Sequence, residues 1–199
     1  METLDAILQR RSIRKFTNQE IPKEIVEKIL SSAVHAPSAK NRQPWKFIVI
    51  TGQEKNDMIK AISKGIENEK SGKGLLPNSL CYISGTENTL LAMKQAPITV
   101  LVFNTEENGL WSTANAVERK LFDIANIQSI GAAIENMLLT ATDLGIGSLW
   151  ICDIFFAYRE ICQWLNEENQ LIAAISFGYA NECPDSRPRK RLEDVVEWR

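Results

Sequence analysis

The sequence predicts an α+β fold, because apolar patterns typical of helices and of buried strands alternate irregularly along the chain. The 199 residues are 44% hydrophobic and 24% charged, a composition that allows one globular domain over residues 1–199 with a substantial core. No internal repeat, low-complexity tract or linker divides the chain. We therefore expect one domain in which helices flank a central sheet.

Two short helices are expected before the first strand. The first has Leu4, Ile7 and Leu8 at helical spacing, and the basic turn that follows ends it. The second begins near Pro22, whose ring suits a first helical position, and cannot continue past Pro37. This second helix leads into a loop rich in hydrogen-bonding side chains.

Three continuous apolar runs predict central strands that are buried on both faces. These runs occupy residues 47–50, 98–103 and 171–177. A shorter strand is expected at residues 149–152, after a turn with two glycines. These four segments form the expected central sheet.

The remaining helices are expected between the strands. One lies around residues 54–64, and residues 65–95 have so little periodicity that loops or short helices over a site are expected there. The strongest helical pattern covers residues 126–144 and is too apolar for a surface helix, so we expect burial against the sheet or a second subunit. A last helix is expected at residues 158–166, and a polar tail at residues 182–199.

Composition and charge exclude several classes of function. The net charge of -2 and the pI of about 5.6 give no global field that attracts nucleic acid or an anionic membrane. The N-terminus lacks a leader pattern and no apolar run approaches about 20 residues, so we expect a cytoplasmic protein outside the membrane. The four scattered cysteines favour reduced thiols over disulfides or a metal site, and the single histidine, His35, is expected to be structural.

The basic turn at residues 10–14 is the first candidate site. Arg10, Arg11 and Arg14 place three permanent positive charges in one turn beside Ser12. A ligand would relieve their repulsion, because guanidinium groups bind phosphates, carboxylates and heterocyclic carbonyls. The alternative is a solvated helix end whose cations interact favourably with the helix dipole.

Three further segments carry chemistry, and each has a structural alternative. Residues 36–45 form a loop stiffened by two prolines, which is either a preorganised binding loop or an ordinary connection. Residues 144–150 contain two glycines that allow close approach of a planar ligand, or that only cap a helix. Residues 187–191 contain four cations, which form either a phosphate clamp or a solvated tail.

Together these segments resemble the nitroreductase family, in the same order along the chain. They read Arg-Arg-Ser-Ile-Arg, Ala-Pro-Ser-Ala-Lys-Asn-Arg-Gln-Pro-Trp, Leu-Gly-Ile-Gly-Ser-Leu-Trp-Ile, and the basic tail before Leu192 and Glu193. The resemblance covers nearly the whole chain and is weakest at residues 65–95. It implies a nitroreductase-like fold with a central, mostly antiparallel mixed sheet flanked by helices. It also implies an intertwined homodimer with FMN at the subunit interface.

The cofactor-binding residues that the resemblance implies fall into four groups. The phosphate, ribityl chain and pyrimidine edge of FMN contact Arg10, Arg11, Ser12 and Arg14. The partner subunit covers the flavin with Pro37, Ser38, Ala39 and Asn41. The isoalloxazine lies against Gly145, Ile146 and Gly147. The phosphate clamp is completed by Arg189 and Arg191, with Arg187 and Lys190 as alternatives within this short basic run.

The resemblance also implies the chemistry. NADH or NADPH would reduce FMN by hydride transfer, leave, and be replaced by a nitroaromatic, a quinone or a similar conjugated acceptor in a ping-pong cycle. FMN carries this chemistry, so no side chain is expected to act as a catalytic acid or nucleophile. The cleft over the flavin would be roofed by residues 65–95 and by the segment around Leu110 and Trp111.

Two alternatives stay open. One is a family relative that uses reduced FMN for another reaction, such as dehalogenation or flavin fragmentation. The other is a flavin-binding protein that does not turn over. The sequence does not specify the physiological acceptor or the choice between NADH and NADPH, because no ribose-reading side chain can be placed from it.

Overall fold

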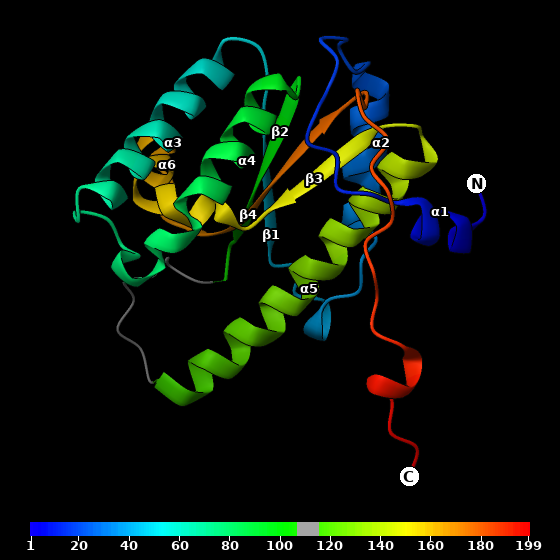
Figure 1. Ribbon diagram of the computed structural model, residues 1–199. Helices are drawn as coiled ribbons and strands as arrows, with labels where there is room; N and C mark the ends of the chain where they lie inside the picture. Colours follow the sequence, from blue (N-terminus) through cyan, green and yellow to red (C-terminus); the bar gives the residue numbers. More distant parts are fainter. Residues whose placement is uncertain (107–115) are drawn as a thin grey trace.

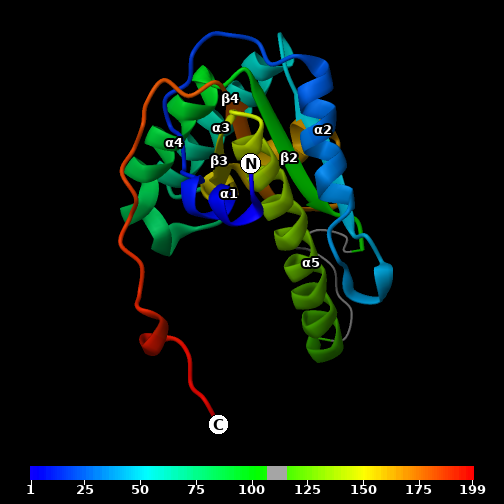
Figure 2. The ribbon, with the colours of Figure 1, turned by 90° about the vertical axis from the view of Figure 1, so that its right-hand side faces the viewer.

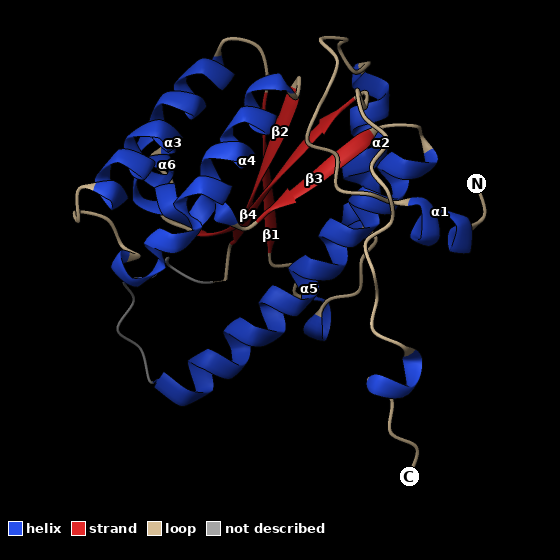
Figure 3. Cartoon of the chain, viewed as in Figure 1, coloured by secondary structure: helices blue, strands red, loops and turns tan. Residues whose placement is uncertain are grey.

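The computed structural model describes residues 1–106 and 116–199, and it has a four-stranded sheet with helices on both faces (Figure 1, Figure 3). The strands are β1 Trp45–Ile50, β2 Ile98–Asn104, β3 Gly147–Ile151 and β4 Gln170–Gly178. The helices are α1 Thr3–Gln9, α2 Lys23–Val34, α3 Glu54–Lys70, α4 Ile83–Gln95, α5 Ala116–Asp143 and α6 Tyr158–Leu165. Short 3-10 turns include η1 Ala39–Asn41, η2 Pro77–Tyr82, η4 Asp153–Ala157 and η5 Leu192–Asp194.

The sheet has the order β1-β2-β4-β3, and its neighbouring strands all pair antiparallel. The apolar β2 and β4 therefore occupy the centre, as their continuous apolar runs predict. The expectation that residues 47–50 form a third central strand is wrong, because β1 lies at the edge of the sheet and its Val49 is 37% exposed. A continuous apolar run indicates a strand but does not specify how many neighbours pair with it. An isolated parallel bridge between Ser12 and Ser148 joins the N-terminal segment to the edge strand β3. The expected α+β fold with a mostly antiparallel sheet is thus confirmed.

Each face of the sheet packs against its own group of helices. Successive residues of β2 point to opposite faces, so Val100 and Val102 pack with α2 and α5 while Leu101 and Phe103 pack on the other side. Burying apolar residues on both faces removes the central strands from water, which is the main favourable contribution to folding. Buried residues of the second face come from three helices and include Met58 of α3, Met93 of α4 and Ile161 of α6.

The expectation of loops or short helices over residues 65–95 is partly wrong. The helix α3 extends to Lys70, and α4 is a regular helix of 13 residues. Ile83, Thr86 and Leu90 of α4 are buried at helical spacing. The polar Thr86 within the buried stripe, together with Gly85, weakens the amphipathic pattern that sequence reasoning depends on.

The helix α5 begins ten residues before the expected residue 126. Its second half is buried against the sheet, where Ile130 and Ile134 are inaccessible to solvent. Its first half extends beyond the sheet in Figure 1 and exposes apolar side chains, including Leu121 at 63%. The expected burial on most sides therefore applies to the second half, and the segment around Leu110 and Trp111 lies outside the described residues.

Within the described ranges, no helix has both the length and the apolar content needed to span a membrane. The same ranges contain no group of three or more His, Cys, Asp or Glu side chains placed to bind a metal ion. The cysteines are free thiols, and His35 caps the C-terminus of α2.

Candidate functional site

The basic turn lies against the start of β3. The Ile13 amide donates to the Ser148 carbonyl at 2.9 Å, and the Ile13 side chain is buried. A Cβ atom on Gly147 would lie only 3.1 Å from Ile13 Cγ1 and from the Gly178 carbonyl oxygen, so any larger residue would have to displace these neighbours slightly. The structure thus brings together two segments, residues 10–14 and residues 145–148, that are more than 130 residues apart in the sequence.

The arginine side chains of the turn have few strong partners within the described chain. Arg10 Nε lies 3.6 Å from Glu135 Oε1 of α5, and its side chain is 23% exposed. Arg11 Nη1 donates to the Leu8 carbonyl at 2.6 Å, at the end of α1. Arg14 is exposed and contacts the Ser12 carbonyl at 3.3 Å. These long or local contacts leave guanidinium donors available for an anionic ligand.

The start of the C-terminal tail is fixed beside the same turn. Glu182 Oε1 accepts the amide hydrogens of Arg14 at 2.5 Å and Lys15 at 3.2 Å. The Asn181 amide donates to the Lys15 carbonyl at 2.9 Å, and Phe16 forms an antiparallel bridge with Ala180. Residues 14–17 therefore direct the tail past the basic turn.

Beyond this anchor, the tail leaves the body of the chain (Figure 1, Figure 2). Arg191 pairs with Glu193 and Asp194, each at 3.2 Å, and Arg189 contacts the carbonyls of Arg187 and Pro188. Among the described contacts, none joins these arginines to residues 10–14 of the same chain. The clamp expected from Arg189 and Arg191 is thus not formed within this single chain.

The loop at residues 36–44 has a strained backbone. Lys40, Asn41 and Gln43 adopt left-handed φ values of 55°, 54° and 52°, a region that non-glycine residues occupy at a cost of roughly 1 to 3 kcal/mol each. The Gln43 amide donates to Ser38 Oγ at 3.0 Å and stabilises this conformation. Such strain is typical of binding sites when the surrounding contacts maintain it.

Helix α5 provides those surrounding contacts. The Ala39 amide donates to Ser129 Oγ at 3.1 Å, and the Arg42 guanidinium lies 4.6 Å from the centre of the Phe122 ring. Figure 2 shows this loop on one side of α5. The helix α1 and the basic turn that follows it lie on the other side. The expected binding residues Pro37, Ser38, Ala39 and Asn41 are therefore not beside Arg10 in the same chain.

An apolar cavity of about 480 Å³ opens beside the end of β3. Its lining includes Leu75, Leu76, Ile127, Trp150, Cys152 and Phe155. Burial, followed by the charge of Asp153, raises the pKa of the Cys152 thiol above its ordinary value of 9.0, so the thiol is neutral at pH 7. The cavity therefore presents uncharged groups to a bound molecule.

Sequence reasoning expected residues 65–95 to cover a site but did not identify the individual residues that line the cavity. Trp150 near the end of β3 and Phe155 in η4 are 38% and 39% exposed, and aromatic side chains at the end of a strand and shortly after it were a usable signal. The Leu75 and Leu76 pair, placed between Gly74 and Pro77, was a second one. Neither identifies a cavity until the fold brings the two segments together.

Comparison of the sequence with known proteins identifies the same family that the motifs resemble. A model of the Nitroreductase family matches residues 7–179 of this chain. A protein of Archaeoglobus fulgidus, provisionally named an NADH dehydrogenase/NAD(P)H nitroreductase, is 31% identical over 189 residues, which cover 92% of this chain and 88% of that protein.

Two solved structures are similar over the whole chain. A BluB-like flavoprotein from Clostridium difficile has 30% identity and a TM-score of 0.79, with 100% of this chain and 99% of that chain covered. A provisionally named nitroreductase in complex with FMN, from Desulfovibrio desulfuricans, has 26% identity and a TM-score of 0.70, with 100% and 98% covered.

Proposed function

Because the chain belongs to the nitroreductase family, we propose that it is an FMN-dependent oxidoreductase that uses NADH or NADPH to reduce conjugated acceptors. The observation that carries this proposal is the contact between the basic turn and the glycine turn, through Ile13 and Ser148. It places guanidinium groups suited to a phosphate next to a backbone that a flat ring system can approach closely.

The residues at this place fit FMN in chemical type. Arg10, Arg11 and Arg14 supply permanent cations for the phosphate and for the oxygens of the pyrimidine edge, and Ser12 supplies a hydroxyl. Gly145 leaves room beside the ring, because nothing lies within 4 Å of a Cβ at that position, and the ring would face the backbone of Ile146 and Gly147. When bound, FMN supplies the hydride chemistry, so the chain's own task is to bind and orient it and to exclude water.

A second copy of the chain would complete the site. The loop at residues 36–44 lies across α5 from the basic turn (Figure 2). A symmetric dimer would bring Pro37, Ser38, Ala39 and Asn41 of one copy to the turn of the other. The tail that carries Arg189 and Arg191 extends from the body of the chain (Figure 1), and we expect these arginines to contact the phosphate at the interface. The exposed apolar face on the first half of α5 supports this dimer.

The acceptors we propose are nitroaromatics, quinones and similar flat molecules. The cavity lined by Trp150, Leu75 and Leu76 has the size and apolar character that such molecules require. One cleft would serve both the nicotinamide and the acceptor, so we expect ping-pong kinetics.

The proposal is tested with the purified protein and a neutral quinone. We expect a yellow protein whose flavin is bleached by NADH or NADPH without oxygen, and parallel double-reciprocal lines with the quinone. A protein that neither carries nor takes up FMN would refute the cofactor. A yellow protein that neither nucleotide bleaches would instead be a binding protein without turnover.

A second candidate uses reduced FMN for another reaction. It is favoured by one observation, namely that a similar structure at 30% identity is named a flavoprotein and not a nitroreductase. Rapid bleaching by NADPH without acceleration by any quinone or nitroaromatic, followed by loss of flavin absorbance in air, would support this candidate over the first.

A further inference from the structure

We propose that Glu69 is a positioning residue that shapes the acceptor cavity through Leu75 and Leu76. The inference rests on the proposed function in one respect, because it takes the cavity beside Trp150 as the place where the acceptor binds. It goes further by naming a residue that does not line that cavity and by predicting a preference for uncharged, apolar acceptors.

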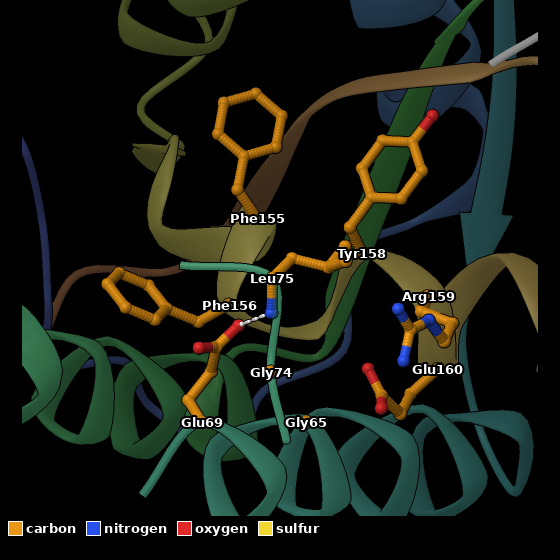
Figure 4. A pocket seen from close by; sticks show the side chains of 9 residues that line it. All are labelled: Gly65, Glu69, Gly74, Leu75, Phe155, Phe156, Tyr158, Arg159 and Glu160. Carbon is orange, nitrogen blue, oxygen red and sulfur yellow. Dashed lines mark hydrogen bonds between the residues drawn. The ribbon is translucent and has the colours of Figure 1, made fainter. Parts of the chain in front are cut away.

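Glu69 is a buried carboxylate in the last turn of α3. The residue is only 2% exposed to solvent, which is rare for a glutamate. Glu69 Oε1 accepts the Leu75 amide hydrogen at 2.6 Å, and both carboxylate oxygens lie 3.1 Å from the Leu76 amide. Figure 4 shows the carboxylate pointing at the backbone of Leu75. These charge-assisted hydrogen bonds offset the cost of burying the carboxylate.

Gly74 allows the carboxylate to approach this closely. A Cβ atom at residue 74 would lie 1.9 Å from Glu69 Cδ and 2.0 Å from Oε2, so any other residue would displace the carboxylate or the loop. Gly72 has a φ of 74°, in the left-handed region. The Gly72 amide donates to the Glu69 carbonyl at 3.0 Å and the Lys73 amide to the Asn68 carbonyl at 2.8 Å, and these bonds close the end of the helix. After this turn the Glu69 carboxylate holds the chain through the amides of the two residues that follow Gly74.

The path of this segment determines one wall of the cavity. Leu75 and Leu76 are half-buried and line the cavity opposite residues of β3 and η4, among them Trp150 and Phe155. If Glu69 released the two amides, the leucines would lose their fixed position. The cavity would then lose its complementarity to a flat apolar molecule.

Two variants and two matched controls test the inference. Glu69→Gln keeps the shape of the side chain but turns an NH₂ group towards one of the amides, and Gly74→Ala displaces the carboxylate without changing it. Glu67→Gln is the control on the exposed face of the same helix. Gly85→Ala is the control for glycine, because nothing lies within 4 Å of a Cβ at that position.

The measurements compare a large apolar acceptor with a small anionic one. For both test variants we expect the KM for 2-methyl-1,4-naphthoquinone to rise about tenfold, as the loss of a hydrogen bond to a charged group predicts. FMN content, and turnover with ferricyanide at saturating NADH, should match the wild type. Hydrogen exchange at Leu75 and Leu76 should become faster, and the controls should change none of these quantities.

The outcomes that overturn the inference are distinct from failure of the proposed function. An unchanged KM for the naphthoquinone in both folded variants, or an equal loss with ferricyanide, would refute the positioning role. If Glu69→Gln does not fold, Gly74→Ala alone decides. Quenching of tryptophan fluorescence by the naphthoquinone, with Trp150→Phe as its control, measures binding without turnover. It therefore tests Glu69 even if NADH and NADPH never reduce the protein.

Discussion

At the residue scale, one ion pair of this chain has a carboxylate that is almost completely buried. Lys46 Nζ lies 2.5 Å from Glu167 Oε2, and the Glu167 side chain is only 8% exposed while that of Lys46 is 47% exposed. Two opposing effects act on the pKa of the Glu167 carboxylate. Burial by itself would raise this pKa, but the hydrogen bonds from Lys46 and Asn169 outweigh burial. The pKa therefore lies below its ordinary value of 4.5.

This lowered pKa predicts a pH-dependent contribution to stability. Because the folded state favours the ionised carboxylate, its contribution is fully present above about pH 4.5 and is lost as the pH falls through the folded pKa. Glu167→Gln should therefore lower the free energy of unfolding near pH 7 and have a smaller effect near pH 3. Urea denaturation across this range measures the difference. A difference that is constant with pH would contradict the assignment.

Arg10 is the second residue whose role can be isolated. Its side chain is only 23% exposed, and its 3.6 Å contact with Glu135 is weak. We expect Arg10→Ala to weaken FMN binding by about 2 to 3 kcal/mol, because a charge-assisted contact to the cofactor is lost. Fluorescence titration of the apoprotein measures the affinity. Lys60→Ala, at a side chain that is 75% exposed, is the control and should leave the affinity unchanged.

At the element scale, the contact between α3 and η4 requires a glycine. A Cβ on Gly65 would lie 2.5 Å from Ala157 Cα and 2.7 Å from the Phe156 carbonyl. Backbone atoms cannot move aside as the end of a flexible side chain can. The close packing of these two elements also supports the loop that Glu69 organises, since Gly65 and Glu69 lie on the same face of α3.

Two glycine substitutions in neighbouring helices should therefore have opposite effects. Gly65→Ala should destabilise the fold by about 1 to 3 kcal/mol through overpacking. Gly85→Ala in α4 should stabilise it by up to about 1 kcal/mol, because alanine is the better helix former and space is open there. Urea denaturation of both variants gives the two values. Equal effects would show that helix propensity, not packing, decides both.

At the scale of the whole molecule, apolar side chains remain exposed on the part of α5 that extends from the sheet. Val117, Leu121 and Ile124 are 72%, 63% and 43% exposed at positions i, i+4 and i+7. This spacing places them along one face of the helix. A large exposed apolar face is typical of a surface that another subunit covers.

We therefore expect the protein to sediment as a dimer and Leu121→Glu to sediment as a monomer. The variant should also lose FMN, because the proposed site needs a second copy of the loop at residues 37–41. Leu91→Glu is the control, at a leucine that is 55% exposed on α4 at the other face of the sheet. A monomeric variant that still retains FMN would contradict a site shared between subunits.

Local sequence patterns identified the basic turn of the candidate site but not the role of Glu69. The basic turn was recognisable because three arginines within five residues need an external partner or solvent. Glu69 was not, because a glutamate near the end of an amphipathic helix is expected to be solvated. Only the return of the chain at Gly74 buries it and shows which amides it binds.

The sequence by itself determined where the strands lie along the chain, the buried half of α5 and the membership of the family. Each depends on residues that are close together in the chain, so their periodicity or motif order is visible without the fold. The tertiary structure decided the strand order, the extent of α4 and the contact of the basic turn with Ser148. These features depend on which segments, distant in the sequence, pack together and exclude water. A local sequence pattern does not specify which distant segment a strand, helix or turn will pack against.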